Sequence, residues 1–413
     1  MLCNHVGFAV FMLLLLIAPK IPLRIPGGAE RSSVSLGIVG LVLWYLTYSK
    51  KLFCFPRIKI SHPLFWIIIF AIYAFIVSFL STNIVSIVYS FQYLFYVVFG
   101  TVLMKRYRYN FYNTNHNCAR SIFFAIAIVF SVGILVSVLT GPIYPQLTLA
   151  TQRQWAGLRI QHGVGFSEAY SIAASPAIFF VAACIYLYRD KIWKKLILLS
   201  LLLFALLATL SRGAIFSFAL TLGFVYCLDS VEPFTKRASI KVSVFKNIAF
   251  VAMIIGPLIL IMMNHSTTKA LLRAICVGFG LTPQHDVVSK DMAARFSLWT
   301  WGLDNWASGG LLKMIFGGGF RSSMTAGYAW KDAHNVYITI LGDFGIVGLA
   351  LFLAALFVAF FRYTNLILKN KAGRFEKFGL MVVLALSIQN MTGPYFYSPI
   401  SLSLLIFTFA VTL

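Results

Sequence analysis

The stretch DAHNVYITILGDFGIVGLALF, residues 332–352, places a His-Asn pair directly ahead of a glycine-studded apolar run. From His334 to residue 361 a helix would be about 42 Å long, which exceeds the roughly 30 Å hydrocarbon layer of a membrane. The first turn of such a helix extends beyond the hydrocarbon. We therefore expect a membrane-spanning helix that begins with His334 at the outer water interface.

The rest of the chain has the same apolar character. Of its 413 residues, 60% are hydrophobic and 11% are charged, and the mean hydropathy is +0.87. A chain of this composition cannot hide its apolar side chains in the core of a water-soluble domain. We predict an all-α polytopic membrane protein with about twelve transmembrane helices in a single transmembrane domain, residues 1–413. The predicted spans are 5–19, 33–49, 63–82, 84–104, 120–141, 166–188, 196–210, 213–228, 247–263, 335–361, 378–392 and 396–413.

The region 196–228 forms either two short spans or one re-entrant pair, and the sequence does not choose between them. Its length is too great for one span and small for two. With two spans and an inside N-terminus, most of the 34 Lys and Arg residues fall on one side in short loops. The positive-inside rule expects this distribution, so the net charge of +23 mainly reports topology. No base-stacking motif or basic arm indicates nucleic acid as a partner.

This topology leaves two insertions on the outer face. One is 142–165, and the other is a large periplasmic loop, 264–333, inserted before the motif helix. Within that loop, residues 291–307 contain aromatic and apolar side chains at helical spacing, which predicts an amphipathic helix at the membrane interface. A glycine turn at 317–320 then interrupts regular structure.

His334 is the first candidate for chemistry. On a continuous helix Gly345 and Gly348 share a stripe with His334, whereas Asp343 lies about 180° away. Together with Gly342, these glycines predict close packing of a neighbouring helix. The residues alone leave open whether His334 is functional or an ordinary interfacial histidine.

Arginines are the second group of candidates. Arg212 lies between two very apolar stretches, where a guanidinium group is costly and is functional by default. Arg295 is placed at the start of the Trp-rich helix, and Arg159 and Arg321 flank other features of the outer loops. Guanidinium groups bind phosphate oxygens with paired hydrogen bonds, so several at a membrane surface suit a diphosphate. For Arg153 and Arg321, interfacial snorkelling is the favoured alternative.

The acidic residues point away from metal and nucleotide chemistry. There is no DxD or HExxH arrangement and no P-loop, so the sequence predicts neither a metal site nor ATP hydrolysis, and no cofactor.

His334-Asn335, followed by nine residues and then Gly345-x-x-Gly348, resembles the HN-x9-GxxG motif of the O-antigen ligase and O-antigen polymerase superfamily. The resemblance extends to Ser211-Arg212-Gly213, and to Arg295 with Trp299 ahead of the glycine turn. It implies a metal-independent glycosyltransferase of the GT-C type that acts at the periplasmic face of the bacterial inner membrane. Its donor would be an oligosaccharide carried on undecaprenyl diphosphate.

The resemblance also implies roles for the candidate residues. His334 would accept the proton of the acceptor hydroxyl as it attacks the anomeric carbon, with inversion. Arg212 and Arg295 would stabilise the charge that grows on the leaving diphosphate. The substrate-binding set is Arg159, Arg212, Arg295, Arg321 and Asn335.

Three functions follow from these observations. A polymerase, which joins repeat units, is favoured because SKDMAARFSLW followed by a short GGGF turn resembles polymerases of this superfamily. A ligase would transfer the glycan to lipid A core instead. A secondary transporter is the third possibility, but the long outer loop and the lack of paired acids in mid-membrane oppose it. Membrane lipids, a flippase and a chain-length regulator are the expected neighbours.

Overall fold

The computed structural model describes most of the chain, and the statements below concern the described residues. They are 2–17, 20–22, 33–35, 37–48, 58–112, 117–140, 152–155, 158–161, 170–189, 191–209, 211–230, 285–322, 333–369, 371–391, 393 and 398–412. The chain forms two compact units. Unit 1 contains Met1–Ile126, Ser289–Phe360 and Leu386–Leu413, and unit 2 contains Ala127–Val288 and Phe361–Ala385.

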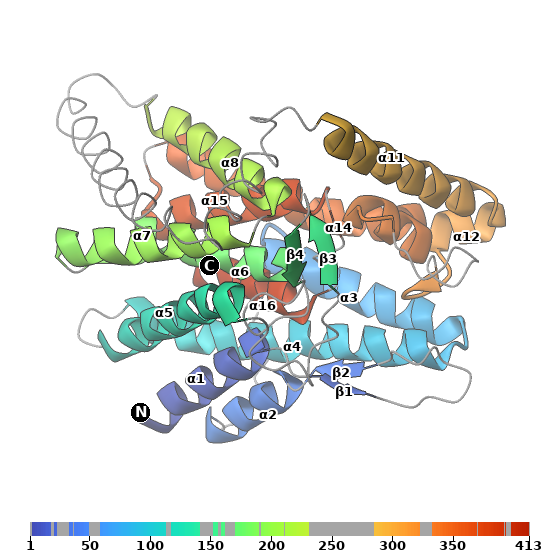
Figure 1. The fold of residues 1–413 in the computed structure, drawn as a ribbon. Coiled ribbons are helices and arrows are strands. Elements are labelled where there is room, and N and C mark those ends of the chain that lie inside the picture. The colour runs from blue at the N-terminus through green and yellow to red at the C-terminus, as the bar shows by residue number, and fades with distance from the viewer. Residues whose placement is uncertain are drawn as a thin grey trace. The chain divides into compact units, whose positions relative to one another are not determined.

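Unit 1 is built mainly from apolar helices (Figure 1). They are α1 (Leu2–Ile17), α2 (Gly37–Tyr48), α3 (Pro63–Leu80), α4 (Ile84–Tyr112), the start of α5 (Asn117–Thr140), α11 (His285–Ala307), α12 (Gly310–Phe316), most of α14 (Val336–Leu368) and α16 (Pro399–Val411). Helix α16 packs against α4, α3 and α1, and its residues from Ile400 to Val411 are all buried. This helix is therefore the centre of the unit.

Local sequence explains where these helices begin and end. Pro63 starts α3, with the His62 ring accepting a hydrogen bond of 3.1 Å from the Leu64 N–H. Ser398 caps α16 in the same way, ahead of Pro399. Proline suits the first helical position because its missing N–H would have no partner there.

Unit 2 contains α6 (Tyr170–Leu187), α7 (Ile192–Ala208) and α8 (Arg212–Ser230), together with most of α15 (Arg374–Gln389). Both α7 and α8 pack against α6. The region 196–228 therefore forms two separate helices. Whether these are two spans or a re-entrant pair stays a prediction.

The predicted runs agree well with the described helices. Every run except 247–263 overlaps a helix, and 247–263 lies outside the described residues. In the described part of the chain, three helices are long and apolar enough to cross a membrane: Pro63–Leu80, Ile84–Lys105 and Val336–Leu368. The number of twelve spans stays a prediction.

Three features differ from the predictions. The fold is helical but not purely so, because β1 (Lys20–Pro22) pairs antiparallel with β2 (Ser33–Ser35), and β3 (Gln152–Trp155) with β4 (Leu158–Gln161). Helix α11 begins at His285, so Arg295 lies in its middle and not at its start. Helix α12 was not predicted, since its seven residues are too few to show a helical period.

Candidate functional site

His334 lies on a turn just before α14 and not inside the helix. The helix starts at Val336, and His334 has a φ of 47°, in the left-handed region. The His334 side chain is exposed, while its neighbours Ala333 and Asn335 are buried. A positive φ is uncommon outside glycine, and such residues cluster at functional sites. The turn thus presents the imidazole to its surroundings on a fixed backbone.

Asn335, the second residue of the pair, caps α14. Its side-chain oxygen accepts the N–H of Tyr337 at 3.0 Å and, more weakly, that of Ile338 at 3.4 Å. The N–H of Val336 donates to the Asn390 carbonyl at 2.9 Å. The amides that open α14 therefore have partners within the protein. An anion bound nearby must be held by side chains, since this helix start is occupied.

Sequence reasoning missed the contribution of the α15 end to this site. Besides the bond that the Val336 N–H donates to the Asn390 carbonyl, the Tyr337 hydroxyl donates to the Ser387 carbonyl at 2.8 Å. Asn390 is 4% exposed, and its side-chain oxygen has no hydrogen-bond partner among the described residues. The only hint in the sequence was the pair of amide side chains Gln389-Asn390 at the end of an apolar run. Their contact with α14 joins segments far apart in the chain, so no local sequence pattern predicts it.

The helix that follows His334 is broken at Gly345. There φ is 65° and ψ is −169°, so α14 consists of two helical parts joined by a kink. The predicted stripe of His334, Gly345 and Gly348 on one continuous helix is therefore wrong. A wheel at 100° per residue applies neither across the kink nor to His334, which precedes the helix.

At the kink, Gly345 allows backbone to pack directly against backbone. A Cβ on Gly345 would collide with the Ile315 carbonyl and lie 2.7 Å from the Gly317 nitrogen. The Tyr73 hydroxyl of α3 lies 2.9 Å from the Phe316 oxygen and 3.1 Å from the Phe344 oxygen. The end of α12, the kink of α14 and the middle of α3 thus meet at one point.

Asp343 anchors the glycine turn that follows α12. It is fully buried, and its side-chain oxygens accept the Arg321 N–H at 2.8 Å and the Ser322 hydroxyl at 3.4 Å. Its backbone oxygen accepts the Gly319 N–H at 2.9 Å. The turn therefore directs its amides toward Asp343, and Gly317 and Gly319 supply the positive φ values of 86° and 94° that this requires.

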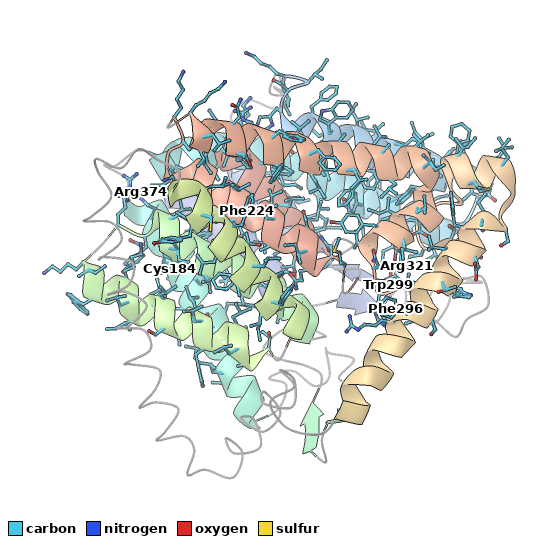
Figure 2. The ribbon with its side chains drawn as sticks, turned by 90° about the horizontal axis from the view of Figure 1, so that it is seen from above. Cys184, Phe224, Phe296, Trp299, Arg321 and Arg374 are labelled. Atoms are coloured by element: carbon cyan, nitrogen blue, oxygen red, sulfur yellow. The ribbon has the colours of Figure 1, made fainter. Side chains whose placement is uncertain are left out.

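The backbone and the side chain of Arg321, in this turn, are both held in place. Its φ is 63°, and its guanidinium carbon lies 4.0 Å from the centre of the Tyr89 ring on α4. The Tyr89 ring stacks in turn with Phe320, at 5.9 Å between centroids. Stacking leaves the edge of a guanidinium group available for hydrogen bonds. Figure 2 shows Arg321 in this part of the unit, with Trp299 and Phe296 of α11 labelled nearby.

Helix α11 brings Arg295 toward the His334 turn. A Cβ on Gly302 would lie 2.7 Å from a methyl group of Ile338 and 3.2 Å from the Ala333 Cβ, so α11 packs directly against the start of α14. Arg295 precedes Gly302 by seven residues, which is two helical turns and about 10 Å on the same face. Arg295, partly exposed, thus shares the face that meets the residues flanking His334.

The other two predicted arginines belong to unit 2. Arg159 lies in β4 opposite Gln154, and Arg212 is the first residue of α8, directly after the buried Ser211. The side chains of Arg159 and Arg212 lie outside the described residues. Unit 1 thus brings together His334, Asn335 and the face of Arg295, and it fixes Arg321 at the α14 kink.

The apolar helices of sufficient length define the class of the chain as a helical membrane protein. Within that class, residues 197–353 match the family model described as O-antigen ligase. The matched segment contains Arg212, Arg295, Arg321 and the motif from His334 to Gly348, so the predicted resemblance to the O-antigen ligase and polymerase superfamily is confirmed. No curated protein matches the chain.

Proposed function

We propose that this protein is a glycosyltransferase of the GT-C type at the periplasmic face of the bacterial inner membrane, and that it polymerises glycan repeats carried on undecaprenyl diphosphate. The family match over 197–353 supports a ligase-like or polymerase-like reaction. The observation that carries the proposal is the exposed His334 on its left-handed turn, beside the helix that bears Arg295.

In this reaction the acceptor hydroxyl donates its proton to the His334 imidazole while its oxygen attacks the anomeric carbon of the donor sugar. The bond from that carbon to the diphosphate oxygen breaks, and its electron pair leaves with the lipid diphosphate. Attack from the opposite face inverts the anomeric configuration. Imidazole groups exchange protons near neutral pH, which suits this step.

Side-chain cations would neutralise the leaving group. Arg295 and Arg212 are assigned to the negative charge that grows on the diphosphate, with Arg159, Arg321 and the amide of Asn335 in binding roles. A lipid diphosphate is already an activated donor, so the proposed reaction needs neither a nucleotide nor a metal or other cofactor.

The test is transfer of labelled glycan in liposomes that contain the purified protein and a lipid-diphosphate-linked oligosaccharide, without ATP. The sharpest variant is His334→Asn, because asparagine tolerates a positive φ but lacks a group that accepts a proton from the hydroxyl. We expect an unchanged melting temperature and a loss of transfer of at least about 100-fold, the usual contribution of a general base. Full activity in His334→Asn would exclude the base role.

The second candidate is a ligase, which the description of the matched family model favours. The two differ only in the acceptor, a lipid-linked repeat or lipid A core. In a deletion strain, lipopolysaccharide capped by a single repeat indicates a polymerase, whereas bare core with accumulated lipid-linked polymer indicates a ligase. Substrate counterflow without bond formation would instead identify a transporter.

A further inference from the structure

The α11–α12 hairpin carries an apolar face that no described part of the chain covers. Leu311 and Leu312 are 71% and 74% exposed, and Phe296, Leu303 and Phe316 are also exposed. The hairpin is held together from inside, since the Trp306 ring N–H of α11 donates to the Met314 carbonyl of α12 at 3.0 Å. An apolar face of this kind on a rigid hairpin needs an apolar partner.

Helix α3 shows how deep in the membrane this face lies. At 18 residues α3 is about 27 Å long, slightly less than the roughly 30 Å of hydrocarbon, so almost its whole length lies within the hydrocarbon when it spans the membrane. Tyr73 is seven residues from Leu80 and ten from Pro63, which places it about 10 Å or more from either end. Its hydroxyl lies 2.9 Å from the Phe316 oxygen. The end of α12 therefore lies beside the middle of α3, within the length of this candidate span.

Two contacts flank the contact of Phe316 with Tyr73 along the chain. Gly302 of α11 packs at the start of α14, and Gly319 packs against Ser81 at the α3–α4 turn. Phe316, between them, makes the contact that lies nearest the middle of α3.

Backbone hydrogen bonding fits this depth. Irregular backbone within a membrane is tolerated only where the protein satisfies its polar groups. The Gly317 N–H donates to the Lys313 carbonyl, Gly319 to Asp343, and the Phe320 N–H to the Ser78 hydroxyl, at 2.8, 2.9 and 3.0 Å. The carbon chain of Lys313 lies along Gly309 and Gly318, so this cation does not point out of the apolar face.

We propose that α12 and the end of α11 form a membrane-embedded re-entrant hairpin, whose face of Leu303, Leu311, Leu312 and Phe316 contacts the acyl chains of the lipid bilayer. The exposed Phe296 and the partly exposed Trp299, whose rings meet at 5.3 Å, lie further back on α11 at the level of the membrane interface. The proposal concerns membrane contact alone and does not depend on the reaction assigned to His334.

A single nitroxide label tests it. Leu312→Cys is labelled in a background whose six native cysteines are replaced by alanine and whose melting temperature matches the parent, then reconstituted in phosphatidylcholine vesicles without substrate. Collision rates are measured with oxygen, which concentrates in hydrocarbon, and with a water-soluble nickel chelate. Ile76→Cys on the exposed face of α3 is the lipid control, and Lys59→Cys is the water control.

We expect the label at Leu312 to behave like the one at Ile76, with the oxygen-to-nickel collision ratio at least several-fold above that at Lys59. A ratio like that of Lys59 would place the hairpin in water and overturn the proposal. Low collision rates with both reagents would mean that protein covers the face, which also overturns it. Leu311→Cys repeats the measurement if Leu312→Cys does not fold.

Discussion

Gly345→Ala tests whether the α14 kink holds α12 in place. With φ at 65° and ψ at −169°, position 345 lies in a region that is essentially restricted to glycine, and an alanine there costs about 1–3 kcal/mol. The new Cβ would also overlap the Ile315 backbone, which cannot move without shifting α12, for about 1–3 kcal/mol more. We expect a total loss of about 2–6 kcal/mol.

The assay is thermal unfolding of the purified protein in detergent, followed by tryptophan fluorescence at a fixed scan rate. With roughly 2–4 °C per kcal/mol as the scale for large domains, the apparent melting temperature should fall by about 4–24 °C. Gly223→Ala on α8 is the matched control, because its Cβ would meet nothing within 4 Å. That change should leave stability equal or raise it by up to about 1 kcal/mol, since alanine favours helix.

Gly348→Ala distinguishes backbone strain from side-chain crowding. Its Cβ would overlap the Phe344 Cβ, which moves only with the backbone, and lie 3.3 Å from the Tyr73 ring, but the backbone at Gly348 has no positive φ. Its effect should fall between those of Gly345→Ala and Gly223→Ala. If Gly345→Ala and Gly223→Ala have the same apparent melting temperature, the kink does not hold α12. That result would refute the packing inferred between α12 and the kink.

Two further changes probe the supports of the site. Asp343→Ala removes the acceptor of the part-buried Arg321 N–H, at a cost of about 1–3 kcal/mol, and one of the two acceptors of the Ser322 hydroxyl. Asp343→Asn, which keeps one acceptor oxygen, should lower the melting temperature less. Asn335→Ala removes the cap of α14 and should cost about 1 kcal/mol, whereas Asn335→Asp should retain stability. If the two variants at position 343, or the two at position 335, had equal melting temperatures, the assigned hydrogen bonds would be contradicted.

Apolar run length predicted most helices correctly because it depends on composition over about 20 residues, which packing details barely change. The structure shows two helices, α7 and α8, in the region 196–228, whereas the choice between two spans and a re-entrant pair stays a prediction. The short β hairpins were missed because of their length. With strands of three or four residues, they show no alternating pattern.

The local geometry around the candidate residues was not predicted. An asparagine directly ahead of an apolar run is a known cap signal, and it would have placed the helix start after His334 and not at it. The kink was hidden because Gly345 lies within an unbroken apolar run, where a glycine also fits close helix packing. Asp343 was judged by its angle from His334, although its partners come from residues about twenty positions earlier in the chain.

The glycine turn and the start of α14 both look, in sequence, like places where backbone amides hold a phosphate. Their hydrogen bonds argue against that role. The amides of Gly319 and Arg321 are directed to Asp343, and those of Val336 and Tyr337 to Asn390 and Asn335. Both segments therefore use their amides to hold the fold. In the proposed reaction the amides of these two segments are therefore not the ones that bind the diphosphate, and the role of neutralising its charge is assigned to guanidinium groups.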